Sequence, residues 1–156
     1  MDWFALIALI VTGFTACAEF GSYAFVHPVI RRLPANYHIQ VEQGLLKTFG
    51  RVMPVLMTLC SIIGVSYLVY VWPLGAREQL LAALSAISFG ASLVSTIIFN
   101  VPINLATGKW DAKHPPKDWE KTRNKWEFFQ GVRSWLLLIG FVFLAATIAD
   151  QLGTKA

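Results

Sequence analysis

Two long stretches of this chain carry no charged side chain, and they limit what it can fold into. Residues 52–76 and 79–108 contain no Asp, Glu, Lys or Arg. Each stretch exceeds the roughly 20 apolar residues that an α-helix needs to cross a bilayer. The whole chain is 56% hydrophobic and 14% charged, whereas soluble domains carry about 25% charged residues. The composition therefore excludes a soluble enzyme, a disordered tail and a secreted disulfide scaffold.

Four apolar segments are expected to span the membrane. They are residues 3–26, 52–72, 79–101 and 132–149. Helix-start signals in the two long connections predict helical extensions over about 34–51 and 115–133, each running without a break into the span that follows. The sequence therefore predicts an all-α, membrane-spanning antiparallel four-helix bundle. Residues 1–156 form a single integral membrane domain in this prediction, with helices 2 and 4 extended into the cytoplasm.

The positions of the basic residues predict how the bundle is oriented. Of the 13 Lys and Arg residues, four lie in the first connection and seven in the third. Only Arg77 and Lys155 fall on the other side. Because Lys and Arg are enriched in cytoplasmic loops, both termini are expected outside the cytoplasm of a multi-pass protein in the cell inner or plasma membrane. The basic residues that give the chain its net charge of +4 are then expected to contact membrane lipids. No nucleic-acid partner is expected.

Polar residues recur along one face of the third span. Ser88, Ser92 and Thr96 are followed at the same four-residue spacing by Asn100 and Asn104. Small hydroxyl residues commonly hold membrane helices together. The two asparagines flank a proline at position 102, which removes a backbone donor and makes this turn irregular. Such backbone is tolerated at membrane depth only where it is buried in protein or lines a cavity.

The first span places Glu19, Tyr23 and His27 four residues apart on one helix face. Glu19 is the only acid within an apolar span, and an unpaired carboxylate in hydrocarbon is costly. Two interpretations remain open for it. It is a buried partner of Arg31, Arg51 or Arg133, or it is a proton acceptor or substrate ligand.

The fourth helix carries a stripe of aromatic and cationic residues at helical spacing. The stripe consists of Trp119, Arg123, Trp126, Gln130 and Arg133. Seams of this period are usually apolar. The stripe is either cation–π scaffolding with interfacial anchoring, or one wall of a cytoplasm-facing pocket with aromatic sides and cationic donors. Three lysines at positions 117, 121 and 125 fall on another face, which is expected to be solvated beside anionic headgroups.

The histidines do not indicate a metal or haem site. His27, His38 and His114 all fall on the predicted cytoplasmic side, but no two of them have ligand spacing. We therefore expect no metal.

A longer pattern joins the end of the third span to the start of the fourth. It contains Asn100-x-Pro102-x-Asn104, then Trp110, and then the stripe in the form Trp-x3-Arg-x2-Trp-x3-Gln-x2-Arg. This pattern resembles the anthrone oxygenase-like family of small four-span membrane proteins, most of whose bacterial members are catalogued as a domain of unknown function. The family pattern has a histidine where this chain has Gln130. The resemblance extends more weakly over the first connection and so covers most of the chain.

The resemblance implies oxidation of an anthrone to an anthraquinone by molecular oxygen, without a redox cofactor. It implies that Trp119 and Trp126 stack on a flat substrate while Arg123 and Arg133 hold its enolate-like oxygen. Because glutamine cannot titrate, Glu19 or His27 would replace the family histidine as the base.

These arguments select one set of candidate site residues and leave two functions open. The catalytic positions are Glu19, His27 and Gln130. The substrate-binding positions are Tyr23, Asn100, Asn104, Trp119, Arg123, Trp126 and Arg133. The protein is either a cofactor-independent oxidoreductase or binder of a flat aromatic or quinone-like small molecule, or a non-catalytic small subunit or stabiliser of a larger membrane protein complex. Homo-oligomers are compatible with both functions.

Overall fold

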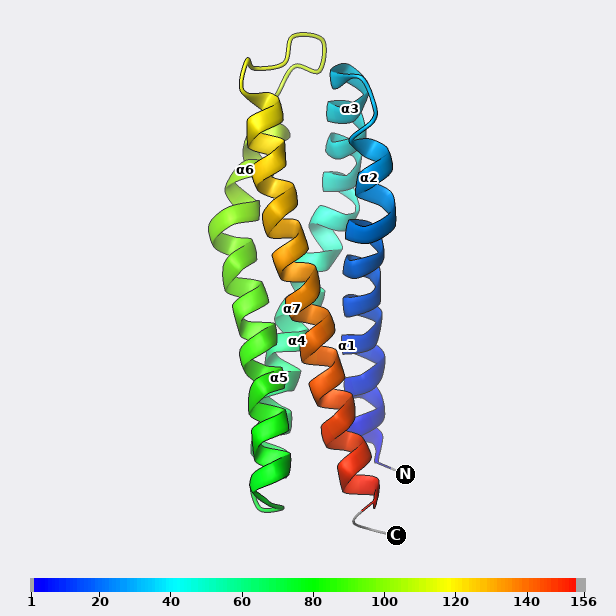
Figure 1. Cartoon of the computed structure of the whole chain (residues 1–156), viewed down its shortest axis with the longest axis vertical. Coiled ribbons are helices and arrows are strands. Elements are labelled where there is room, and N and C mark those ends of the chain that lie inside the picture. The colour runs from blue at the N-terminus through cyan, green and yellow to red at the C-terminus, as the bar shows by residue number, and fades with distance from the viewer. Residues whose placement is uncertain (1, 154–156) are drawn as a thin grey trace.

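The computed structural model describes residues 2–153, and the side chains of all of these except Leu152. Its secondary structure within that range is helical, and four helical stretches are long and apolar enough to cross a membrane. They are Trp3–Ile30, Phe49–Val71, Ala76–Thr107 and Trp119–Gln151. The four stretches pack side by side as one bundle (Figure 1), which confirms the predicted all-α four-helix architecture.

The first stretch contains a wide turn beside a proline. It consists of α1 (Trp3–Gly21), the π-helical turn η1 (Ser22–Val26) and α2 (His27–Ile30). Pro28 has no N–H with which to bond the carbonyl four residues before it. At the end of η1 the N–H of His27 bonds the carbonyl of Ser22, five residues back. A π turn adds a residue to the helix and so changes which side chains beyond it face the bundle.

The second stretch is interrupted, contrary to the prediction of an unbroken helix. It consists of α3 (Ala35–Lys47) and α4 (Phe49–Val71), and Thr48 between them has φ −111° and ψ −81°. Both the N–H and the hydroxyl of Thr48 bond the carbonyl of Leu45. A threonine hydroxyl competes in this way with the regular helical hydrogen bonds. The helical extension therefore ends at Lys47, and α4 starts afresh.

The third stretch repeats the arrangement of the first. It consists of α5 (Ala76–Ser95), the π-helical turn η2 (Thr96–Asn100) and α6 (Val101–Thr107). Again a proline, Pro102, follows the wide turn, and the N–H of Val101 bonds the carbonyl of Thr96 five residues back. The predicted irregularity at this proline is therefore confirmed.

The last stretch is a single helix, α7 (Trp119–Gly153). Its unbroken course confirms the prediction for residues 115–133, apart from the first four residues, which precede the helix. The start of α1 and the end of α7 lie at one end of the bundle, whereas α3 and the loop between α6 and α7 lie at the other (Figure 1).

Small residues hold α5 against α7. The hydroxyl of Ser85 donates to the carbonyl of Gly140 at 2.9 Å, and that of Ser92 donates to the carbonyl of Arg133 at 3.2 Å. A Cβ added at Gly140 would come within 2.8 Å of the Phe89 ring. These contacts support the interpretation of the serine stripe as interhelical packing.

Large apolar side chains cover the outside of the bundle. The exposed ones include Ile7, Phe14, Val65, Ile87 and Val142. Several polar side chains are instead fully buried, among them Glu19, Ser92 and Asn100. A soluble protein rarely exposes so much contiguous apolar surface. With four apolar helices of spanning length, this distribution identifies a multi-pass membrane protein.

Candidate functional site

Glu19 forms the centre of the first buried polar cluster. Its Oε2 accepts from Arg133 Nε at 3.1 Å and from Gln130 Nε2 at 2.9 Å. Arg133 Nη2 lies 3.0 Å from the same oxygen. The hydroxyl of Ser134 donates to the Glu19 backbone carbonyl at 3.2 Å and fixes α1 against α7. Of the three basic partners open to Glu19, the structure selects Arg133, as the cost of an unpaired carboxylate requires.

Glu42 on α3 forms the centre of a second buried cluster. Arg123 Nη2 lies 2.7 Å from its Oε1. His27 Nδ1 lies 3.4 Å and His38 Nε2 3.8 Å from the same oxygen. All four side chains are buried. The cluster therefore joins α2, α3 and α7 through one carboxylate.

The cluster changes the proton affinities of the two α3 residues, which lie outside the apolar spans. Burial alone would raise the pKa of Glu42, but the His27 imidazole and the charge of Arg123 outweigh it and hold this pKa below its ordinary value. Burial lowers the pKa of His38, and the attraction of Glu42 only partly offsets it. Near neutral pH the cluster therefore contains a carboxylate paired with a guanidinium, beside a neutral His38.

Trp126 lies between the two clusters. The guanidinium carbons of Arg123 and Arg133 lie 4.2 and 5.7 Å from the centre of its ring. The His27 ring lies 4.9 Å away at a tilt. Asn100 Nδ2 donates to the Trp126 backbone carbonyl at 3.1 Å and ties η2 to α7. The stripe on α7 thus makes the cation–π contacts expected of a scaffold, and Trp126 joins the two clusters.

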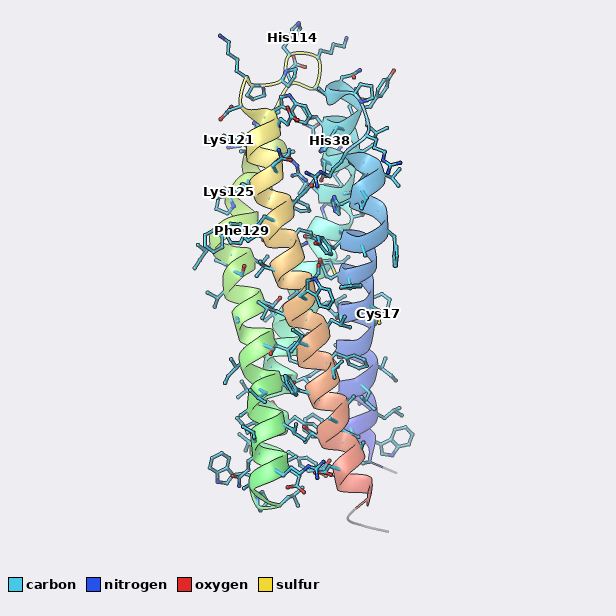
Figure 2. All side chains as sticks on the ribbon, viewed as in Figure 1. Cys17, His38, His114, Lys121, Lys125 and Phe129 are labelled. Carbon is cyan, nitrogen blue, oxygen red and sulfur yellow. The ribbon has the colours of Figure 1, made fainter. Side chains whose placement is uncertain are left out.

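Trp119, the first residue of the stripe, packs against α3 at the end of the bundle. The Trp119 ring meets the His38 ring edge to face, with centroids 5.3 Å apart. In Figure 2 His38 points inward from α3, whereas Lys121 and Lys125 lie on the side of α7 away from it. Both lysines are exposed, in agreement with the solvated face expected for them.

A glycine on α7 makes room for Tyr23. A Cβ at Gly131 would lie 2.8 Å from the Tyr23 ring. Tyr23, inside the η1 turn, and His27, just after it, thus both lie against α7.

A cavity of about 430 Å³ lies between the helices beside both clusters. This volume falls within the range of small-molecule sites. Its polar wall contains Glu19, Ser22, His27, Glu42, Thr96, Asn104, Trp126, Gln130 and Arg133. Its apolar wall comes mostly from α3 and α4 and contains Leu45, Leu46, Phe49, Met53, Pro54, Met57, Val101 and Leu105.

Four buried polar atoms of cavity-lining residues have neither a hydrogen-bond nor an ion-pair partner among the described residues. They are Glu19 Oε1, Asn104 Oδ1, Trp126 Nε1 and Gln130 Oε1. Native proteins leave few buried polar atoms unpaired. These atoms supply one donor and three acceptors to a polar ligand or to water.

Six of the ten predicted site residues line this cavity: Glu19, His27, Asn104, Trp126, Gln130 and Arg133. Tyr23 lines a smaller cavity of about 300 Å³, which shares His27 and Gln130 with the first. The remaining three, Asn100, Trp119 and Arg123, stand behind the wall, where they contact Trp126, His38 and Glu42. The structure thus brings the predicted residues into one region of the bundle.

The sequence prediction does not include Glu42 or His38 among the site residues. A signal for them exists, because His38, Glu42, Leu45 and Phe49 follow each other at the spacing of one helix face. The apolar residues Val41, Leu45 and Phe49 also follow each other at four-residue spacing in this segment and compete with that signal. Val41 is 39% exposed, whereas the other two line the cavity.

In the described part of the chain, no three His, Cys, Asp or Glu side chains are placed to hold a metal ion. Glu42, the carboxylate nearest to two histidines, is already paired with the cation of Arg123.

Comparison with curated proteins, and with solved structures, gives no match. The sequence pattern of the family described as anthrone oxygenase matches residues 45–143. The matched segment contains Arg123, Trp126, Gln130 and Arg133, whereas Glu19, His27 and Glu42 precede it. Since this match covers more than half of the chain, the protein belongs to the anthrone oxygenase family.

Proposed function

We propose that this protein binds a flat, oxygen-bearing aromatic molecule of the anthrone class in the 430 Å³ cavity and oxidises it with molecular oxygen. The observation that carries the proposal is the arrangement of the polar wall. An indole face, Trp126, stands between a carboxylate held by Arg133 and an imidazole held against Glu42. The family to which the chain belongs supports the reaction class.

The chemistry proposed needs a base, an oxyanion donor and a slot that excludes water. The methylene of an anthrone is acidic because its carbanion delocalises into the fused aromatic ketone. Loss of that proton yields an enolate, which passes one electron to dioxygen. The resulting radical and superoxide combine to a peroxide anion, which takes back the proton from the base to become a hydroperoxide, and loss of water leaves the second ketone. In sum, the methylene and one dioxygen become a carbonyl and one water.

His27 is the proposed proton acceptor. Its Nδ1 faces Glu42, which leaves Nε2 for the substrate, and a carboxylate behind an imidazole stabilises the imidazolium that forms. Glu19 is the alternative acceptor through its unpaired Oε1. Arg133 and the Nε1–H of Trp126 are the proposed donors to the developing enolate oxygen.

Anthrone itself provides the test. The protein is reconstituted in nanodiscs, and oxygen uptake and anthraquinone formation are followed together. We expect His27→Ala and Glu42→Gln each to slow turnover by about 10²-fold or more, the usual contribution of a general base. His114→Ala is the matched control, because this histidine lies exposed in the α6–α7 loop, where it contacts Asp111. Turnover that survives both substitutions would contradict the assignment of the base.

A non-catalytic role in a larger membrane complex is the second candidate. The observation that favours it is Gln130, a group that cannot titrate, lying within the cavity wall. Purification in mild detergent separates the two functions. A stoichiometric membrane partner and no oxidation of anthrone would support the structural role, whereas a lone protein that binds and oxidises anthrone would exclude it.

A further inference from the structure

The cavity is closed along the bundle axis at the end that carries α3. His38, Glu42 and Arg123 fill that end and are at most 3% exposed. Beside them, Gln43 Nε2 donates to the backbone carbonyls of Thr107 and Trp110, at 3.0 and 2.9 Å. These bonds tie α3 to the end of α6. A ligand therefore does not reach the cavity straight down the axis from the water.

The cavity opens instead at its side. Its exposed lining residues come from two places only: the first two turns of α4, and α6 with the residues just after it. They are Gly50, Pro54, Leu105, Gly108 and Lys109. Thr48, where the helix is interrupted, lies two residues before Gly50, the first residue of this group. The opening between α4 and α6, called the lateral mouth here, is defined by these five residues.

The lateral mouth lies at the edge of the apolar spans. The second apolar helix starts at Phe49, and the third ends at Thr107. The side chains next to the mouth are apolar and face outward, with Leu105 65% and Val52 53% exposed. Lys109 lies just beyond the span, where a cationic side chain meets lipid headgroups. The mouth therefore faces the bilayer, just below the headgroups on the side that carries α3.

We infer that the site takes its ligand sideways from the bilayer, and that the ligand is an amphiphilic aromatic ketone or quinol. Its oxygen-bearing ring enters the polar wall beside Trp126, and an apolar substituent stays in the mouth between α4 and α6. The apolar wall leads from the mouth to the polar atoms. The cavity therefore changes from apolar to polar in the same order as the ligand does from its substituent to its oxygen-bearing ring. This inference rests on the proposed function, because it concerns the substrate of the same cavity.

Two glycines at the mouth allow a direct test. An added Cβ would meet no atom closer than 3.5 Å at Gly50 and 3.4 Å at Gly108, so Gly50→Trp and Gly108→Trp narrow the mouth from opposite sides without a backbone clash. Gly44→Trp is the matched control. It adds the same indole to an exposed helical glycine with open space around it, away from the cavity wall.

The ligands are the decyl ester of anthraquinone-2-carboxylic acid, which partitions into lipid, and the water-soluble anthraquinone-2-sulfonate. Binding to protein in phosphatidylcholine nanodiscs is followed by stopped-flow tryptophan quenching. We expect the ester to bind wild type and Gly44→Trp alike, and the sulfonate to bind both far more weakly. At the mouth variants, association and release of the ester should both slow by about tenfold or more, with a smaller change in Kd, because a narrowed passage acts on both rates.

The outcomes separate this inference from the proposed function. Mouth variants that bind and release the ester at wild-type rates would overturn lateral access, and so would a sulfonate that binds as tightly as the ester. A raised Kd with faster release would mean that the indole fills the cavity, which also counts against a passage at this place. A wild-type protein that binds the ester yet leaves anthrone unoxidised contradicts only the proposed reaction.

Discussion

Arg133 gives two of its nitrogens to a single oxygen of Glu19. Nε lies 3.1 Å and Nη2 3.0 Å from Oε2, while Oε1 of the same carboxylate has no hydrogen-bond partner among the described residues. The pair is buried, and it joins α1 to α7 at the level of the cavity. The arrangement holds the carboxylate firmly by one oxygen and leaves the other available to a ligand.

Removing one member of this pair should destabilise the bundle more than removing both. Glu19→Leu or Arg133→Met alone leaves an uncompensated buried charge, which costs about 3–5 kcal/mol, whereas an apolar pair of similar volume is often tolerated. We expect the double variant to recover most of the stability but none of the binding of an anthraquinone ligand. Unfolding in mixed SDS micelles measures the first effect and tryptophan quenching the second. A double variant that binds as wild type would show that the pair only supports the fold.

The stability of the protein should depend on pH through His38. Burial holds the pKa of His38 below its usual 6.5, so as the pH falls through 6.5 the unfolded chain takes up a proton before the folded one. The melting temperature should therefore fall between about pH 7.5 and 5.5. The groups that face His38 are Glu42 on its own helix, His27 from α2, Arg31 just after α2, and Arg123 from α7.

Glu42 adds no slope in this window, because its lowered pKa lies below its usual 4.5 and its contribution is lost only under more acidic conditions. We expect His38→Gln to flatten the dependence of the melting temperature on pH, as measured by scanning fluorimetry in detergent. Equal slopes for wild type and His38→Gln would show that another group takes up the proton.

Gln130 offers a gain of function. Its amide donates to Glu19 Oε2 at 2.9 Å and lines the cavity. Gln130→His would place a titratable ring beside the proposed substrate position. We expect anthrone oxidation to become faster by about tenfold or more near pH 7, since a positioned imidazole commonly contributes at least that much. Gln130→Met controls for the loss of the hydrogen bond, and equal rates for the His and Met variants would show that this position needs no base.

The orientation in the membrane stays a prediction, and cysteine labelling tests it. In a background without Cys17, which is exposed, a thiol at Lys113 should be protected from an impermeant reagent in intact cells. A thiol at Leu74, in the exposed turn between α4 and α5, should react. The basic residues of the first and third connections give the physical reason. The reverse labelling pattern would move the lateral mouth to the outer leaflet.

Much of the architecture follows from the sequence because hydrocarbon leaves the chain few choices. Residues 52–76 and 79–108 have no charge, and a segment of that kind satisfies its backbone in a bilayer only as a helix. The irregular turn beside Pro102 is predictable for an equally local reason, since proline has no N–H to donate. The break at Thr48 is not predictable from the sequence. Many threonines lie inside unbroken helices, and only tertiary packing decides which threonine ends a helix.

The candidate site is likewise predictable from the sequence only in part. The helical spacing of Glu19, Tyr23 and His27, and of the α7 stripe, is a property of the sequence, and it places these groups on two faces that have to be buried. The choice of Arg133 for Glu19, and of Arg123 for Glu42, joins residues that are far apart along the chain. Tertiary packing makes that choice, because a buried carboxylate pairs with whichever cation the helix crossings bring within reach.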